Sequence, residues 1–589
     1  PQKNTQNFRK GHVIIYSASK KQFIQDVFSN QIADKIYEIY QKKIGQTTKS
    51  EFSSWVYSMN YMSNALIQAN IDDDSQVAIE YQVPNTSKRV DFIIAGLNRD
   101  HEESVVIVEL KQWAKAALTT RDGIISSFVG RKERELTHPS YQAWTYAQLI
   151  QEYNEIVQRD AIHLYPCAYL HNYERKYQSD ILNEFYQEYL DKAPAFLRDD
   201  AVRLSNFIKE HIHYGDHKDI LYRIDHGRIK PSKSLGERIA SMLDGNQEFL
   251  MIEDQKIVFE TLLEYAHQIN DTNKKRVFII KGGPGTGKSV IAINLLVHLI
   301  NELQLNAQYV TKNSAPRTVY SALLKGFRKK SFIDNLFKGS GSYTETESNY
   351  FDCLIVDEAH RLNEKSGLFS NRGENQIKEL INAAKMTIFF IDEAQRVTFK
   401  DKGSIAEIKK WADAQNSLTY ELELSSQFRC NGSDGYIAWV DNLLEIRETA
   451  NPVLDTEEFD FKVFDDPTKL RDAIFEKNKI NNKARLLAGY CWNWDKDQRS
   501  NTHHHDITIE KHHFSMSWNL GSDGMEWLIK EDSVNEVGCI HTSQGLELDY
   551  IGVIIGDDLR YENGKIITDV TKRAKTDQSV KGWKKRMKE

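Results

Sequence analysis

Hydrophobic and polar residues follow different periods along the first part of the chain. Apolar side chains recur at helical spacing over residues 13–75, and residues 76–111 then change to strand-like segments, VAIEYQV, RVDFIIAG and VVIVELKQW. Helical spacing returns over 140–158, and an apolar segment at 163–170 predicts a buried strand. This order predicts an α/β domain in which helices precede a three-stranded meander.

A different pattern begins at Arg276, where short apolar strands alternate with helices. VFIIK, AQYV, CLIV and MTIFFI are apolar throughout, which is typical of strands buried on both faces of a parallel sheet. A similar block follows from about Leu418, and the polar, mainly helical stretch before the first block is interpreted as a connector. We therefore divide the chain into residues 1–175, a connector at 176–245, and two α/β blocks at 246–417 and 418–589.

Composition supports a folded protein of several domains. The chain has 589 residues, which is too long for one hydrophobic core, and 40% of them are hydrophobic and 27% charged, as in globular proteins. No signal-peptide segment follows the N-terminus and no run reaches the roughly 18 apolar residues of a membrane span, so we expect a cytoplasmic protein without a membrane partner. The net charge of −7 means that binding to nucleic acid requires local basic segments, such as 325–330 and 572–588.

A glycine-rich loop follows VFIIK and leads into an apolar helix. It consists of Gly282, Gly283, Pro284, Gly285, Thr286, Gly287, Lys288 and Ser289. Such a loop between a strand and a helix predicts a phosphate-binding site, because glycines allow main-chain N–H groups to wrap the phosphates. Lys288 supplies positive charge at the β and γ phosphates of ATP, and the Ser289 hydroxyl is a ligand for Mg²⁺.

Two adjacent carboxylates follow the strand CLIV, about seventy residues further on. Alone, the pair Asp357 and Glu358 would suggest only a solvated helix N-terminus. After a phosphate-binding loop, we expect Asp357 to hold Mg²⁺ and Glu358 to act as the general base that activates the attacking water.

These motifs resemble those of the superfamily 1 helicases, in the same order along the chain. The resemblance implies two RecA-like lobes and extends over Gln255, YVTKNS at 309–314, FFIDEAQR, LSSQFRC at 424–430 and CIHTSQGLELDYIGVII at 539–555. It implies that Gln255 recognises adenine and that YVTKNS grips the nucleic-acid strand. It further implies that Asp392 and Gln395 couple the γ-phosphate to that strand, and that Arg429 reaches the γ-phosphate from the second lobe. Gln544 departs from the family pattern by replacing its usual lysine.

A closer resemblance is to the Schlafen-type helicase domain of bacterial proteins, some of which are nuclease-helicases of phage immunity. SQFRCNGSDGY, AGYCWNW and HTSQGLELDYIGVIIG carry this resemblance, which we expect to cover essentially the whole chain. The superfamily pattern also calls for a final arginine motif. Arg573 in DVTKRAK resembles it only superficially, because no apolar strand precedes it. We therefore expect the second lobe to be incomplete, with its last motif following Glu589.

A second group of chemically active residues lies in the meander. Asp91 is in RVDFII, and Glu109 and Lys111 in VVIVELKQW share one strand face because they are two residues apart. Two carboxylates and a lysine resemble the PD-(D/E)xK nuclease core. Gln142 and Tyr146, four residues apart on the following helix, match the Q-x-x-x-Y motif of RecB-type nucleases. Glu51 and Glu80 are weaker candidates for further metal ligands.

Mg²⁺ or Mn²⁺ bound to these oxygens would polarise a phosphodiester and activate water. An edge-strand charge pair and a degenerate core that only binds remain alternatives. The leading hypothesis is an ATP-dependent nuclease-helicase acting on single-stranded or partly duplex DNA in defence against phage. The other hypotheses are an ATP-gated nucleic-acid sensor and an RNA-directed nuclease. The sequence is also compatible with a homo-oligomer.

Overall fold

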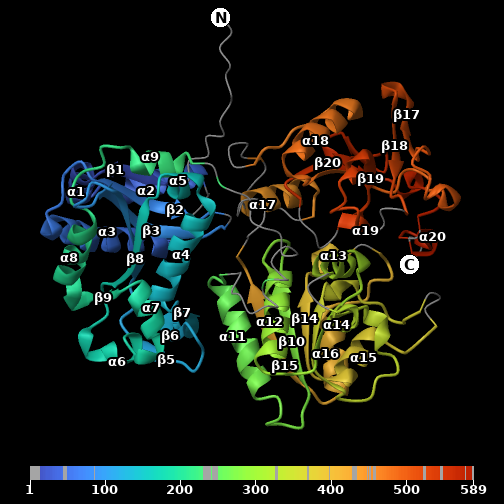
Figure 1. The fold of residues 1–589 in the computed structure, drawn as a ribbon, viewed down its shortest axis with the longest axis horizontal. Coiled ribbons are helices and arrows are strands. Elements are labelled where there is room, and N and C mark those ends of the chain that lie inside the picture. Colours follow the sequence, from blue (N-terminus) through green and yellow to red (C-terminus); the bar gives the residue numbers. More distant parts are fainter. Residues whose placement is uncertain are drawn as a thin grey trace, which may run out of the picture.

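Three large sheets and their helices form the framework of the chain in the computed structural model (Figure 1). The structure describes residues 14–43, 49–84, 86–227, 229, 241, 250–325, 329–367, 371–396, 398–426, 434–446, 449, 453–454, 459–521, 526–543, 548–577 and 579–586. Parallel strand pairs occur in all three sheets, which confirms the predicted α/β class with parallel sheets. Every helix within the described ranges is too short or too polar to span a bilayer.

The first sheet contains the predicted meander and buried strand. Its strand order is β1 (Tyr16–Ser19), β2 (Gln76–Gln82), β3 (Arg89–Leu97), β4 (Glu103–Lys111), β8 (His163–Leu170) and β9 (Ala195–Leu197). Strands β1 to β4 pair antiparallel in sequence order, whereas β8 runs parallel to β4 and β9 runs parallel to β8. The register pairs Phe92 with Val108 and so brings the ends of β3 and β4 together.

Helices cover both faces of this sheet. Phe92 and Val108 face a core shared with α1 (Lys20–Phe28), α2 (Ile32–Lys43), α3 (Lys49–Ala69) and α8 (Ala201–His211). Ile93 and Ile107 face the opposite core, shared with α4 (Pro139–Tyr153), α5 (Glu155–Arg159) and α9 (Ile220–Asp225). Because side chains alternate along a strand, Asp91, Glu109 and Lys111 lie on the α4 side.

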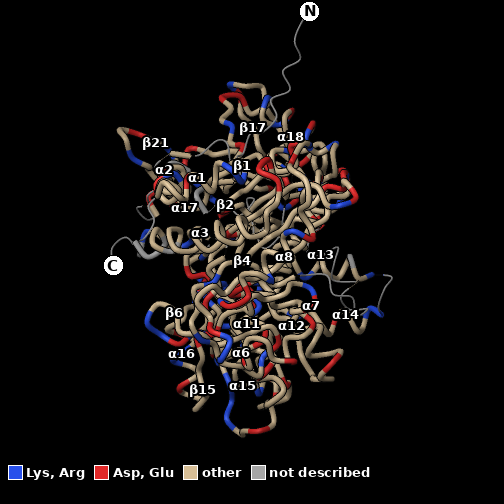
Figure 2. The backbone as a smooth tube through the Cα atoms, turned by 90° about the vertical axis from the view of Figure 1, so that its left-hand side faces the viewer, with Lys and Arg blue, Asp and Glu red and all other residues tan. Residues whose placement is uncertain are grey.

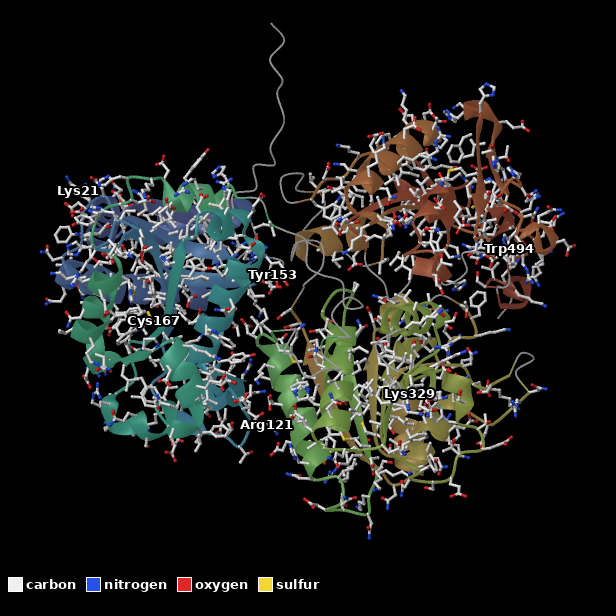
Figure 3. The ribbon with its side chains drawn as sticks, in the orientation of Figure 1. Lys21, Arg121, Tyr153, Cys167, Lys329 and Trp494 are labelled. Carbon is white, nitrogen blue, oxygen red and sulfur yellow. The ribbon has the colours of Figure 1, made fainter. Side chains whose placement is uncertain are left out.

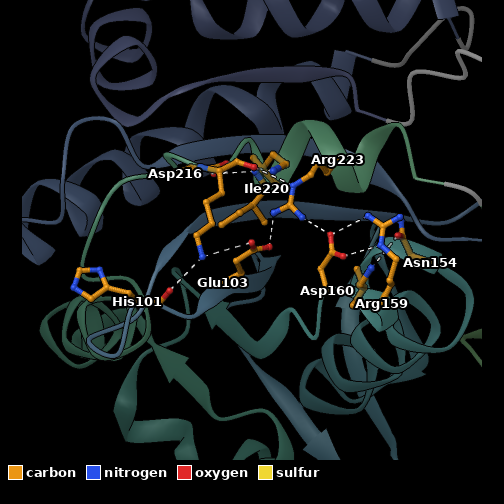
Figure 4. Close-up of polar contacts among 11 residues, drawn as sticks. His101, Glu103, Asn154, Arg159, Asp160, Asp216, Ile220 and Arg223 are labelled. Atoms are coloured by element: carbon orange, nitrogen blue, oxygen red, sulfur yellow. Dashed lines mark hydrogen bonds and ion pairs between the residues drawn. The ribbon is translucent and has the colours of Figure 1, made fainter.

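The stretch interpreted as a connector contributes to the first domain up to Asp225. It supplies β9 to the sheet and α8 to the packing against α3. Figure 4 shows how α9 is attached: the Arg223 guanidinium forms ion pairs with Glu103 and Asp160. Strand β9 has only three residues, which is too short to produce a recognisable period in the sequence. We call residues 14–225 the front domain.

The front domain also contains a small three-stranded sheet that was not predicted from the sequence. It consists of β5 (Ala116–Leu118), β6 (Ile124–Val129) and β7 (Lys132–Thr137), and the short helices α6 (Gln178–Ile181) and α7 (Gln187–Lys192) lie near it. Strand β7 reads KERELT and is largely exposed, so hydrophobic alternation does not reveal it.

The second sheet is entirely parallel, as expected from its apolar strands. Its order is β12 (Phe337–Lys338), β11 (Ala307–Thr311), β13 (Phe351–Asp357), β14 (Ala384–Ile391), β10 (Arg276–Gly282) and β15 (Leu418–Leu424). Helices α11 (Asp254–His267), α12 (Lys288–Asn301), α13 (Ser314–Leu324) and α14 (Lys330–Leu336) pack on one face, and α15 (Gln376–Ala383) and α16 (Ile405–Ala414) on the other. Strand β15 pairs with β10 and completes this sheet, although our division placed it in the following block.

The third sheet has the order β17 (Ile507–Ile509), β18 (Phe514–Trp518), β19 (Glu536–Gly538), β16 (Ala484–Ala488) and β20 (Tyr550–Ile554). Around it lie α17 (Asp434–Leu443), α18 (Pro467–Asn481), α19 (Ile540–Ser543), the hairpin β21 (Leu559–Glu562) and β22 (Lys565–Thr568), and α20 (Trp583–Arg586). We call the second and third sheets with their helices the first and second lobes. Basic and acidic residues are interspersed along the described backbone (Figure 2).

Candidate functional site

The glycine-rich loop connects β10 to α12 as predicted. Gly285 and Gly287 have φ values of 79° and 84°, a left-handed conformation that a residue with Cβ adopts only with strain. This path brings the loop back over the N-terminus of α12, where free N–H groups and the helix dipole favour a phosphate. The Lys288 ammonium donates to the carbonyl oxygens of Gly282 and Gly283 at 2.7 Å each, so its charge lies directly on the loop.

Ser289 and Asp357 meet beside the loop. The Ser289 hydroxyl donates to Oδ2 of Asp357 at 2.6 Å, and the Tyr309 hydroxyl donates to the same oxygen at 2.6 Å. They meet because parallel strands end at one edge of the sheet, which is where ligands bind in such folds. Burial raises the pKa of Asp357, and the negative charge of Glu358 adds to this. A hydroxyl beside a buried carboxylate fits the Mg²⁺ that accompanies ATP.

Glu358 follows in a left-handed conformation, with φ 54° and ψ 44°. Its Oε2 lies 3.0 Å from Nε2 of His360, which is fully buried. Nδ1 of His360 accepts a hydrogen bond from the Asp392 main-chain N–H at 3.3 Å, which in a neutral ring leaves the proton on Nε2. The predicted general base is therefore connected through His360 to the end of β14.

The first turn of α11 contacts the loop from the other side. Gln255 donates from Nε2 to the Thr286 carbonyl oxygen at 3.2 Å. Oδ2 of Asp254 accepts hydrogen bonds from the main-chain N–H and hydroxyl groups of Ser425 and Ser426, at distances of 2.6–3.1 Å. One turn of helix thus joins the phosphate-binding loop to the segment that leaves β15.

The remaining helicase-type residues are placed only in part. Gln395 lies in a 3-10 turn (Glu393–Gln395) at the end of β14, and Lys312 forms an ion pair with Asp401 at 2.9 Å. Arg573 binds Asp577 at 2.6 Å and Asp558 at 3.1 Å. Arg429 and Gln544 lie outside the described residues.

The front domain brings its predicted carboxylates and lysine together. Oδ2 of Asp91 accepts a hydrogen bond from the Leu110 main-chain N–H at 2.7 Å, and the Lys111 ammonium donates to Oε1 of Glu109 at 2.7 Å. Burial and then the charge of Asp91 raise the pKa of Glu109 well above its usual range. Although burial acts against a charged lysine, Glu109 and Asp91 raise the pKa of Lys111. Two carboxylates are a sufficient protein contribution for Mg²⁺, which keeps several waters.

Helix α4 adds Gln142 and Tyr146 to this group. Gln142 donates from Nε2 to the Tyr146 hydroxyl at 3.0 Å, which confirms that the two side chains share a helix face. The Tyr146 hydroxyl in turn donates to Oε1 of Glu253, the residue directly before α11. Burial raises the pKa of Tyr146, and the charges of Glu253 and Glu109 raise it further. We call Asp91, Glu109, Lys111, Gln142 and Tyr146 the front site.

Of the two weaker candidates for metal ligands, the structure describes the side chain of Glu80 and not that of Glu51. The Glu80 carboxylate accepts a hydrogen bond from Nε1 of Trp55 on α3 at 3.0 Å. Glu51 lies in α3, and its side chain is outside the described part of the chain. Among the described residues, no group of three or more His, Cys, Asp or Glu side chains is arranged to hold a metal ion.

Three residues that contact these sites were not among the predicted site residues. His360 follows Glu358 in Asp-Glu-Ala-His, so its position beside the expected base was the available signal. Lys88 and Glu253 carry no motif, because their ion pair joins segments 165 positions apart in the chain numbering.

Comparison with known proteins identifies the family of the second half of the chain. Residues 275–589 match the Schlafen group 3 DNA/RNA helicase domain. The chain belongs to this family. The match supports the predicted helicase function, with its requirement for ATP and nucleic acid, but it does not reach the front domain. The expected coverage of essentially the whole chain is therefore confirmed only from residue 275 onward.

Two further similarities were found. An uncharacterized protein of Saccharomyces cerevisiae is 26% identical over 370 residues, covering 54% of this chain and 76% of the yeast protein. The crystal structure of the Pif1 helicase from Candida albicans matches with 13% identity and a TM-score of 0.23, covering 34% of this chain and 46% of that chain. The chain thus spans less than half the length of the Candida protein.

Proposed function

We propose that this chain is an ATP-dependent nuclease-helicase that acts on DNA. The lobes use ATP and Mg²⁺ to move along a single strand or to unwind a duplex, and the front domain cuts the strand with Mg²⁺ or Mn²⁺. The observation that carries the nuclease assignment is the group formed by the buried Glu109 with the half-buried Asp91 and Lys111, beside Gln142 and Tyr146. A cytoplasmic role in defence against phage or foreign DNA is part of this proposal.

In the nucleotide site, each residue has a distinct task. Ser289 and Asp357 would hold Mg²⁺, which neutralises charge on the β and γ phosphates when bound. Lys288 provides a second positive charge there, and Gln255 contacts the adenine. Glu358 takes the proton of the attacking water, while His360 orients the Glu358 carboxylate. Arg429 would complete the site from the second lobe.

In the front site, Asp91 and Glu109 would hold the metal ion, which polarises the phosphodiester and acidifies water when bound. Lys111 orients that water through its ammonium group. Gln142 and Tyr146 donate hydrogen bonds to the nucleic acid backbone. The high pKa of Glu109 means that its carboxylate gains most from a bound cation.

The test uses labelled single-stranded DNA, duplex DNA and RNA, with and without ATP and Mg²⁺. We expect metal-dependent cleavage of DNA that is lost in Asp91→Ala, Glu109→Ala and Lys111→Ala, while each variant retains nucleic-acid-stimulated ATP hydrolysis. Cleavage that persists in all three variants would place the nuclease elsewhere. Preferential cleavage of RNA would change the substrate class, and ATP hydrolysis without unwinding or cleavage would favour a nucleic-acid sensor.

A further inference from the structure

Three consecutive residues connect the two sites of the chain. Glu253 extends to the front site, Asp254 binds Ser425 and Ser426, and Gln255 binds the Thr286 carbonyl in the phosphate-binding loop. Neither the family match nor any motif includes Glu253, because the match starts at residue 275. The position of Glu253 therefore depends on both domains.

The Glu253 carboxylate is surrounded by hydrogen-bond donors. Its Oε1 accepts from the Tyr146 hydroxyl and from Nε2 of Gln142 at 3.4 Å, and its Oε2 forms an ion pair with the Lys88 ammonium. An ammonium, an amide N–H and a phenol O–H around one anion are the groups that bind a phosphate oxygen equally well. Glu253 thus stands where a phosphate of the nucleic acid backbone would bind.

The backbone of Glu253 shows that this position is constrained. Its φ of 42° and ψ of −115° are unfavourable for a residue with a Cβ atom. Such a conformation persists only where surrounding contacts hold it, and here the contacts of Asp254 and Gln255 lie on one side and those of Lys88 and Tyr146 on the other. A shift at the nucleotide site therefore acts directly on Glu253.

Helix α11 is otherwise firmly attached to the front domain. Lys256 forms an ion pair with Asp122 at 2.8 Å, and Arg121 binds Glu264 from Nε at 2.7 Å. Figure 3 shows Arg121 at the junction between the front domain and α11. A movement confined to the residues before Lys256 would thus release Glu253 while the rest of α11 stays attached to the front domain.

We propose that Glu253 closes a phosphate subsite formed by Lys88, Gln142 and Tyr146, and that ATP binding withdraws it. ATP engages Gln255 and the loop containing Thr286, and the second lobe moves the segment after β15 that binds Asp254. Because Asp254 directly follows Glu253, a displacement of Asp254 also moves Glu253, and the subsite then opens to a phosphodiester. This coupling of two sites rests on the proposed function of the front domain as a nucleic-acid site.

The first experiment measures access to the subsite without cleavage. A photoreactive single-stranded DNA oligonucleotide is crosslinked to the full chain in Ca²⁺, with and without a non-hydrolysable ATP analogue, and crosslinks to residues 139–153 are quantified. In the wild type we expect the analogue to increase these crosslinks about tenfold, as loss of one charge-assisted contact implies. We expect Glu253→Ala to crosslink without the analogue as strongly as the wild type does with it. Glu253→Gln keeps the shape of the side chain but loses the ion pair, so its crosslinking without the analogue should lie between those of the wild type and Glu253→Ala.

Glu264→Ala is the matched control, because it removes a carboxylate from the same helix and the same domain contact but not from the subsite. It should keep the wild-type response to the analogue. Equal crosslinking with and without analogue in the wild type, or a Glu253→Ala variant that still responds to it, overturns the proposal.

The second experiment repeats the comparison for cleavage in Mg²⁺. We expect Glu253→Ala to cut about tenfold faster than the wild type without nucleotide, for the same reason. If the crosslinks depend on the analogue but no cleavage occurs, the front domain is not a nuclease, and the proposal that Glu253 closes the subsite still holds. If cleavage occurs but is altered neither by the analogue nor by Glu253→Ala, the front domain is a nuclease and Glu253 does not close its subsite.

Discussion

The two sites rely on the same kind of side chain, a buried carboxylate with a raised pKa and a lysine nearby. Burial raises the pKa of both Asp357 and Glu109, and in each case a second carboxylate nearby raises it further. Each site places a lysine within reach, Lys288 on the phosphate-binding loop and Lys111 on Glu109. Such an arrangement favours cations and anionic phosphates together, which is the combination that phosphoryl chemistry requires.

Lys288→Ala and Glu358→Gln should each abolish nucleic-acid-stimulated ATP hydrolysis. Removal of Lys288 takes positive charge from the phosphates, and the Glu358 amide cannot accept a proton, so we expect losses of about 10²–10⁴-fold. Steady-state phosphate release measures the loss, and binding of a fluorescent ATP analogue should survive in Glu358→Gln. Lys378→Ala, which removes an exposed lysine of α15, is the control. Normal ATP hydrolysis in both Lys288→Ala and Glu358→Gln would contradict the assignment of the helicase ATP site.

Residue identities at both sites could be predicted from the sequence, because each belongs to a motif with fixed spacing. The meander and the second sheet bring Asp91 to Glu109 and Ser289 to Asp357, as expected. Contacts such as that of Lys88 with Glu253 could not be predicted, since one charged residue on a polar segment looks like any other.

Among the secondary structure elements, those with long apolar runs were the most predictable. Strands β3, β4, β10, β13 and β14 are mostly buried, β8 is buried in its second half, and all six have clear hydrophobic patterns. Strand β15 alternates polar and apolar residues at the edge of its sheet, and β9 is only three residues long. Hydrophobic pattern reports burial, so edge strands and short strands escape it.

Helix α4 depends on a histidine that caps its N-terminus. Nδ1 of the buried His138 accepts from the Ser140 main-chain N–H at 3.2 Å, and Nε2 lies 2.9 Å from the Ile181 carbonyl oxygen. The neutral ring with its proton on Nε2 satisfies both contacts, whereas protonation of Nδ1 would break the cap. Burial lowers the pKa of His138 to about 4, although the bond to Ile181 opposes this.

We predict that the front domain loses stability in acid because of His138. Between pH 6.5 and about 4 the unfolded chain binds a proton that the folded chain excludes, so the free energy of unfolding falls as the pH falls. The slope is about 1.4 kcal/mol per pH unit, or roughly 3 kcal/mol over this range. Urea unfolding at several pH values measures it.

His138→Asn provides the comparison, because asparagine also caps helices but does not titrate. The variant loses the ring stacked on Tyr186 and starts from lower stability, so the informative quantity is the slope and not the absolute value. A wild type and variant with the same pH slope would show that His138 is already charged when folded.

For the whole molecule, the arrangement of domains was the feature least accessible to sequence reasoning. The front domain and α11 meet through Lys256, Asp122, Arg121 and Glu264, and all four would be assigned to a solvated surface by their type. Figure 1 shows α11 on the side of the first lobe that faces the front domain. Helix α11 therefore carries a residue of the predicted nucleotide site and also forms the contact between the first lobe and the front domain.

We predict that Lys256→Ala uncouples the front domain from the lobes. The ammonium lies between Asp122 at 2.8 Å and Glu260 at 2.7 Å and is largely buried, so its removal leaves two carboxylates facing each other without a cation. Burial already raises the pKa of Glu260, and Lys256 opposes this rise. The buried pair of Lys256 with Glu260 lies within α11, and the pair that joins the domains has the half-exposed Asp122 as its partner. The loss at the domain contact should therefore stay below the roughly 3 kcal/mol that breaking a fully buried pair costs.

In differential scanning calorimetry, the variant should show the unfolding of the front domain at a lower temperature, separated from that of the lobes. ATP hydrolysis should continue, because Gln255 and Lys288 keep their contacts, whereas any response of the front site to nucleotide should weaken. Lys192→Ala is the matched control: its ion pair with Glu188 and its contact with Trp144 lie within the front domain, where an exposed pair contributes less than about 1 kcal/mol. An unchanged calorimetric profile in Lys256→Ala, or the same separation in Lys192→Ala, would show that the charges around Lys256 do not hold the two domains together.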